Sequence, residues 1–124
     1  MSAIFTMGMT SEGCGMLFDR KTVLIERQNL TVGEFNIEID GAYDNIKTFR
    51  MDVKKGRKLF ISIKSDTGVD VSVVDTKGMN RSFSEAVKEK TIGPIPIEEK
   101  GTMALILGVY RGDLAQVELE AWME

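Results

Sequence analysis

Three aspartates, Asp66, Asp70 and Asp75, lie within the short stretch SDTGVDVSVVDTKG. Carboxylates can bind a cation or act as a general acid and base, so their spacing decides between chemistry and a structural role. If the valines between them form a strand, Asp70 lies on the outward face, and Asp66 and Asp75 stand at its ends, about 30 Å apart. One metal ion cannot bind both. We interpret SDTG and DTKG as turns whose Asp or Ser oxygens accept hydrogen bonds from nearby backbone amides.

The chain contains no histidine and one cysteine, Cys14. Histidine is the commonest general base near neutral pH, the usual activator of serine and cysteine nucleophiles and a frequent ligand of transition metals. Its absence excludes hydrolytic triads, and one thiol can form neither a zinc site nor an internal disulfide. The carboxylate of Glu12, the nearest charge in sequence, opposes formation of a thiolate at Cys14. We therefore predict an unreactive cysteine, no catalytic residues and no cofactor.

A second group of oxygen ligands occurs in DGAYDN, where Asp40, Asp44 and Asn45 converge if the loop closes on Gly41. These hard ligands suit calcium, but calcium takes six to eight oxygens and the loop supplies three. The pattern favours a hairpin turn, with calcium binding as the alternative.

The elements that would position these residues are strands, because period-two alternation of apolar and polar residues dominates the sequence. The alternating segments are 35–39, 49–53, 59–63, 69–73, 102–110 and 114–123, with further candidates at 3–9 and 21–28. About eight short strands with turn signals between them predict an all-β fold, a mostly antiparallel two-sheet β-sandwich of the jelly-roll kind. It spans residues 1–124 as a single domain. The last two segments, joined by the turn RGD at 111–113, are expected to form a C-terminal hairpin.

At most one short helix is expected, in SFSEAVKEK at residues 82–90. Ser82 followed three residues later by Glu85 has the form of a capping box, but few residues there are apolar, and a loop or an irregular edge strand fits as well. Pro94 and Pro96 each lack a backbone donor, so any strand that contains them should lie at a sheet edge.

The charge pattern and the N-terminal segment limit the partners. The formal net charge of -3 arises from interspersed acidic and basic residues, and no basic cluster is long enough to neutralise phosphates. Nucleic acid is therefore not an expected partner. The segment MSAIFTMGMTSEGCGMLF has no positive side chain before its apolar part and is interrupted by glycine and polar residues. We expect neither a signal peptide nor a membrane span, and we predict a cytoplasmic protein.

Some apolar residues fall on strand faces that the alternation predicts to be exposed to solvent. Phe60 and Val74 lie opposite the inward rows of their strands, and in TMALILGVY a second apolar row is formed by Ala104, Ile106 and Tyr110. Either the N-terminal strands cover this second face, or it is a contact surface for a homo-oligomer or a protein partner. These five residues are the candidate interface.

The stretch FRMDVKKGRKLFISIKSDTGVDVSVVDTKG, followed by IPIEEKGTMALILGVY and AQVELEAWM, resembles the GOLD domain of membrane-traffic proteins and the related bacterial PPC domain, over about residues 34–124. The shared pattern is a strand before a glycine turn, a long strand, an Asp-containing strand ending in Asp-x-x-Gly and a terminal strand pair. The resemblance implies a β-sandwich that binds proteins or carbohydrates without catalysis. The export signal, membrane anchor, cysteine pair and attached enzyme of those proteins are not seen in this sequence.

We therefore predict a non-enzymatic binding or assembly module that contacts a protein partner or a second copy of itself. A sandwich that binds a small ligand, carbohydrate or calcium, is the alternative. An enzyme that uses Asp, Glu, Lys or Tyr side chains is a third possibility.

Overall fold

The computed structural model describes residues 21–33, 45–110 and 112–124. These ranges contain six strands: β1 (Thr22–Val32), β2 (Ile46–Val53), β3 (Lys58–Val74), β4 (Asn80–Pro96), β5 (Gly101–Gly108) and β6 (Ala115–Met123). All of their pairings are antiparallel. The expected strands at 3–9 and 35–39 lie outside the described residues.

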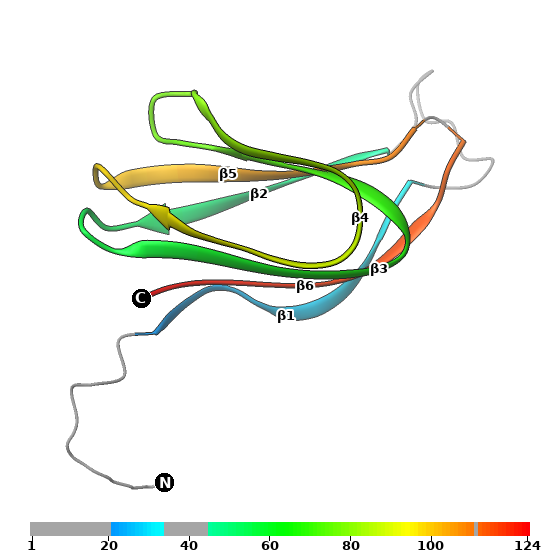
Figure 1. The fold of residues 1–124 in the computed structure, drawn as a ribbon, viewed down its shortest axis with the longest axis horizontal. Helices are drawn as coiled ribbons and strands as arrows, with labels where there is room; N and C mark the ends of the chain where they lie inside the picture. The colour runs from blue at the N-terminus through cyan, green and yellow to red at the C-terminus, as the bar shows by residue number, and fades with distance from the viewer. Residues whose placement is uncertain (1–20, 34–44, 111) are drawn as a thin grey trace, which may run out of the picture.

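The strands form one sheet with the order β1-β6-β3-β5-β2, and β4 also pairs with β3. The long strand β3 pairs with β4 from end to end, and its other edge pairs first with β6, at Leu59–Ser65, and then with β5, at Asp70–Val74. Figure 1 shows that the β3–β4 hairpin curls, so that β2 and β5 lie above β1 and β6. The all-β antiparallel class is confirmed, but the two-sheet arrangement is not, because one continuous curled sheet forms both halves.

The predicted C-terminal hairpin is wrong. No residue of β5 pairs with a residue of β6; the two strands instead follow one another along the same edge of β3. The turn between β5 and β6 therefore connects two strands that pair with successive parts of β3 and not with each other. Sequence proximity suggested the wrong pairing because both strands pair instead with β3, which is distant in sequence.

The stretch SDTG is not a turn between strands but part of the 17-residue strand β3. The curl occurs here, where the β3–β4 register shifts on either side of Val69. A Cβ on Gly68 would lie 3.0 Å from the Cα of Ala86, and Ala86 itself has a φ of 51°. Such a bulge bends a strand while leaving its pairing intact on both sides.

The expected short helix at 82–90 is absent, and the described residues contain no helix. This segment belongs to β4, so the alternative of an irregular edge strand is confirmed, as is the edge position of Pro94 and Pro96. Pairing with β3 satisfies the backbone of the segment and buries Val87, which outweighs a capping box on a helix with few apolar residues. None of the described elements is a helix long and apolar enough to cross a membrane.

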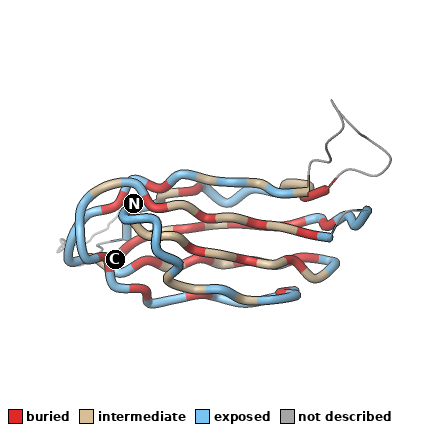
Figure 2. Tube along the Cα trace, turned by 90° about the horizontal axis from the view of Figure 1, so that it is seen from above, coloured by how far each residue is buried: buried red, intermediate tan, exposed pale blue. Residues whose placement is uncertain are grey.

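The core lies on the concave face of the curled sheet, and along β2, β3, β5 and β6 its residues alternate with less buried ones (Figure 2). The inward rows predicted for β3 and β6 are confirmed: these side chains are at most 1% exposed, and they are Leu59, Ile61, Ile63, Val69, Val71, Val73, Ala115, Val117, Leu119 and Ala121. In β5, Met103, Leu105 and Leu107 complete the row, so the even-numbered residues of that strand point outward.

Candidate functional site

The three aspartates of the β3 region act as backbone acceptors. The Oδ1 atom of each accepts a hydrogen bond from a main-chain amide: Asp66 from Gln116 (2.8 Å), Asp70 from Ala86 (2.9 Å), and Asp75 from Lys77 and Met79 (2.9 Å each). Each bond satisfies an amide near a strand start, a bulge or a turn, where regular pairing is interrupted. The turn predicted for DTKG is confirmed. Among the described residues, no group of three His, Cys, Asp or Glu side chains could hold a metal ion.

Asp75 has the one resolved pKa shift in this region. The amide of Met79 is the main cause that holds the pKa of Asp75 below its ordinary value of 3.8; desolvation opposes it, and the amide of Lys77 and the Arg81 guanidinium 3.6 Å away lower the pKa further. Hydrogen bonds to the charged form explain this direction. The hydrogen bonds that lower this pKa stabilise a turn, so the shift by itself does not indicate a catalytic group.

We expect Asp75→Asn to reduce the acid sensitivity of the fold. A depressed carboxyl pKa contributes stability that is fully present above the ordinary value of 3.8 and is lost as the pH falls through the lower folded-state value. The wild type should therefore lose more melting temperature than Asp75→Asn between pH 5 and pH 2.5. Thermal melts by circular dichroism measure the difference, and parallel pH profiles would contradict this role for Asp75.

Asn45, one of the three candidate calcium ligands, has a structural role. Its Nδ2 donates to the carbonyl oxygen of Val109 (3.1 Å), and its own carbonyl accepts from the Val109 amide (3.0 Å), which extends the β2–β5 pairing. The other two candidates, Asp40 and Asp44, lie outside the described residues, as does Cys14.

Three of the five candidate interface residues lie side by side on the convex face of the β4–β3–β5–β2 half of the sheet. Val74 pairs with Ala104, and Ile106 lies one outward position further along β5. Ile46 at the start of β2 and Phe83 on β4 are exposed beside them, at 58% and 57%. We call these five residues the apolar patch.

No described strand covers the apolar patch. The expectation that the N-terminal strands would do so fails for 21–28, because β1 pairs with β6 in the other half of the sheet. The second N-terminal candidate, 3–9, lies outside the described residues.

The other two candidate interface residues lie away from the patch. Phe60 belongs to the β1–β6–β3–β4 half, where its ring stacks on Trp122 with centroids 5.6 Å apart and planes 12° from parallel. Tyr110 follows β5 and is 77% exposed.

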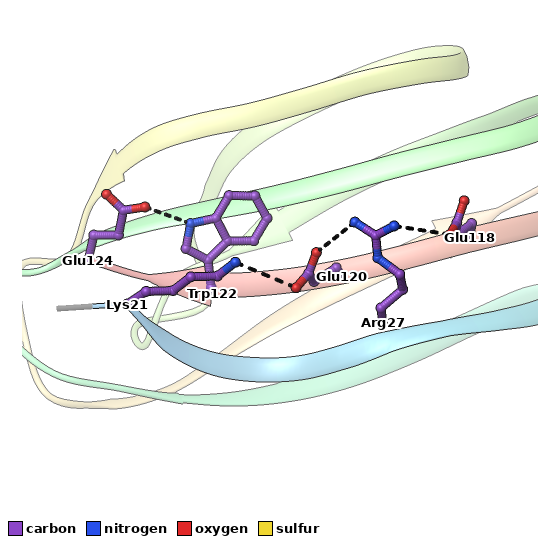
Figure 3. Close-up of polar contacts among 6 residues, drawn as sticks. All are labelled: Lys21, Arg27, Glu118, Glu120, Trp122 and Glu124. Atoms are coloured by element: carbon purple, nitrogen blue, oxygen red, sulfur yellow. Dashed lines mark hydrogen bonds and ion pairs between the residues drawn. The ribbon is translucent and has the colours of Figure 1, made fainter. Parts of the chain in front are cut away.

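The convex face around Trp122 carries a network of charged side chains that the sequence analysis did not identify (Figure 3). Arg27 on β1 forms ion pairs with Glu118 (3.5 Å) and Glu120 (3.3 Å) on β6. Lys21 lies 3.7 Å from Glu120 and 4.6 Å from the centre of the Trp122 ring. The outward parity of Glu118, Glu120 and Trp122 was available from the sequence, but their contact with Phe60 and Arg27 depends on strand register.

From Glu118 and Glu120 of this network, the outward residues of β6, β3 and β4 line up in rows across the strands. One row is Glu120, Ser62 and Thr91, and the next is Glu118, Lys64 and Glu89. These side chains surround an open hollow of about 260 Å³. It has no deep enclosed space of the kind that active sites use.

Comparisons with known proteins bear on the fold. No family model and no curated protein matches the sequence. Among solved structures, the chain is similar to the pre-peptidase C-terminal domain of collagenase from Bacillus anthracis, with a TM-score of 0.53 and 13% identity, over 77% of this chain and 89% of that one. At this identity the likeness concerns the fold alone. It supports the resemblance to PPC domains at that level, whereas a likeness to GOLD domains is not shown.

Proposed function

We propose that the chain is a non-enzymatic, β-sandwich-like binding module that self-associates through the apolar patch. The observation that carries this proposal is the placement of Val74, Ala104 and Ile106 side by side on an outward sheet face, with exposed Ile46 and Phe83 next to them. The first three residues are half-buried and the last two exposed, and apolar side chains gathered on one accessible face are typical of contact sites between proteins.

The charges around the patch favour a second copy as the partner. Its central positions continue into the neutral side chains of Ser72 and Thr48. Arg50 lies in the row of Ala104, and Asp70 lies in the row of Gly108 and Ile46, at the other end of the patch. A copy related by a two-fold axis across the strands brings these opposite ends together, so unlike charges approach and like charges separate.

The size of the patch indicates a weak complex. Four strands about 4.8 Å apart, each contributing about six residues, cover roughly 400 Å² per copy. A standard stable interface buries about 800 Å² per partner, so the expected dimer is transient and concentration-dependent.

The absence of catalysis in this proposal rests on the chemistry of the described side chains. The aspartates nearest to one another are held by backbone amides, the one shifted carboxyl belongs to a turn, and the whole chain lacks histidine. Catalytic carboxylates are instead expected as converging groups with displaced pKa values in a cleft.

We expect Ile106→Arg to abolish self-association, because it places a charge at the centre of the buried contact. Sedimentation equilibrium at rising protein concentrations should give a weight-average mass that increases reversibly for the wild type and stays at the monomer value for Ile106→Arg. The matched control is Ser62→Arg, which adds the same charge to the convex face of the other half and should associate like the wild type. A wild type that stays monomeric up to about 1 mM, or a control that fails equally, would refute the proposal.

A further inference from the structure

The convex face of the β1–β6–β3–β4 half contains three open hollows in line along the outward residues of β3. The first lies at Lys58 and Phe60, the second at Ser62 and Lys64, and the third at Lys64 and Asp66. Their volumes are about 400, 260 and 370 Å³. At about 3.3 Å per residue, the row from Lys58 to Asp66 is roughly 26 Å long. We call this surface the polar groove, and its length suits an extended ligand.

The polar groove is hollow because short side chains form its floor and longer side chains stand on either side of it. Ser62 on β3 and Thr91 on β4 are direct neighbours in the sheet and form the floor of the second hollow. Arg27 and Glu120 stand on one side, and Glu89 on the other.

Side chains supply the binding groups along most of this groove. Along Leu59–Lys64, β3 pairs with β4 on one edge and with β6 on the other, so its main-chain amides and carbonyls are engaged in the sheet. A peptide that binds by adding a strand needs free main-chain groups at a sheet edge. The groups on offer are instead hydroxyls, carboxylates and ammonium groups, which hydrogen-bond well to ligand hydroxyls, since a hydroxyl both donates and accepts.

The charges of the groove nearly cancel, which disfavours a strongly charged ligand. In the second hollow the cations Arg27 and Lys64 face the carboxylates Glu89, Glu118 and Glu120, and Lys21 pairs with Glu120 at 3.7 Å. The first hollow adds one cation and one anion, Lys58 and Glu124, and the third hollow adds the carboxylate of Asp66, which accepts from the Gln116 amide. A polyanion or polycation would gain no net attraction here and would approach like charges in each hollow.

An aromatic row crosses the groove between the first and second hollows. Phe60 stacks on Trp122, and a Cβ on Gly93 of β4 would lie 3.1 Å from the Phe60 ring. Trp122 Nε1 donates to the Glu124 carboxylate (2.9 Å), which fixes the indole. Lys21 lies over the Trp122 ring (4.6 Å), so the apolar contact open to a ligand is Phe60, which lines the first hollow. A rigid aromatic ring beside hydroxyl and carboxylate groups orients ligands with one apolar and several polar faces.

From these features we propose that the polar groove is a binding site for a linear, uncharged oligosaccharide. The ligand lies along β3, its hydroxyls bond to Ser62, Lys64, Glu89 and Thr91, and the C–H face of one sugar ring packs on Phe60. This site is independent of the apolar patch, which lies on the other half of the sheet.

The test uses the full chain, with cellohexaose, maltohexaose and chitohexaose as neutral probes. Binding is followed by the fluorescence of Trp122, the one tryptophan in the chain, and by calorimetry. At least one hexasaccharide should bind with a Kd of about 0.1 to 1 mM, at least tenfold tighter than its monosaccharide. The double variant Lys64→Ala/Glu89→Ala should weaken binding at least tenfold. Lys88→Ala, an exposed neighbour outside the three hollows, should bind like the wild type.

Three results would overturn the proposal: no response to any hexasaccharide up to about 10 mM, equal affinity for hexasaccharide and monosaccharide, or preferential binding of a heparin hexasaccharide. Ile106→Arg separates this proposal from self-association, because it should lose dimerisation and retain sugar binding. Loss of both functions in that variant would argue against two separate surfaces.

Discussion

Leu105→Ala is expected to lower the free energy of unfolding by about 2 to 5 kcal/mol, whereas Ile106→Ala, at the next position of the same strand, should cost less than about 1 kcal/mol. Leu105 is 0% exposed on the concave face, where its truncation leaves a cavity in the core. Ile106 lies on the convex face, is only partly covered, and can be truncated without leaving an enclosed space.

Urea unfolding at low protein concentration measures both variants, with the midpoint compared at constant denaturant dependence. Comparing the two variants tests whether β5 has one buried face and one accessible face, and the apolar patch depends on this difference. Equal losses for the two variants would mean that another part of the chain covers Ile106, and the patch would then be core rather than interface.

The faces of the strands could be predicted from sequence because alternation is a local property. The inward assignment of Ile61, Val71 and Leu119 needs no knowledge of their partners, and the structure buries all three. The period of two in side-chain direction is set by the extended backbone itself.

Strand pairing could not be predicted in the same way. The chain continues through SDTG as one strand because Gly68 on β3 meets Ala86 on β4, a contact between segments that are distant in sequence. The assignment of β5 and β6 to successive parts of β3 likewise depends on pairings that no local pattern records.

The same difference between local alternation and non-local pairing applies to the two candidate surfaces. Val74, Ala104 and Ile106 were identified from parity alone, and the structure places them together. Trp122 was not identified, because one outward aromatic residue gains meaning only when its neighbour across the sheet, Phe60, is known.

Gly93→Ala is expected to cost at least about 3 kcal/mol, since two separate effects add at this position. Gly93 has a φ of 125°, a conformation that residues with a Cβ rarely adopt. A Cβ there would also overlap the carbonyl oxygen of Leu59 and press on the ring of Phe60. The β3–β4 pairing beside the aromatic row would have to separate to admit one methyl group.

Gly56→Ala is the matched control for this substitution. Gly56 also has a positive φ, of 86°, but no atom lies within 4 Å of the Cβ position, so only the backbone strain of about 1 to 2 kcal/mol applies. Chemical unfolding gives the two losses, and the emission of Trp122 reports whether the Phe60 stack has moved. A loss for Gly93→Ala no larger than that for Gly56→Ala, with unchanged emission, would show that β4 does not hold Phe60 against Trp122. The aromatic row would then lack the rigidity that a ligand contact in the polar groove requires.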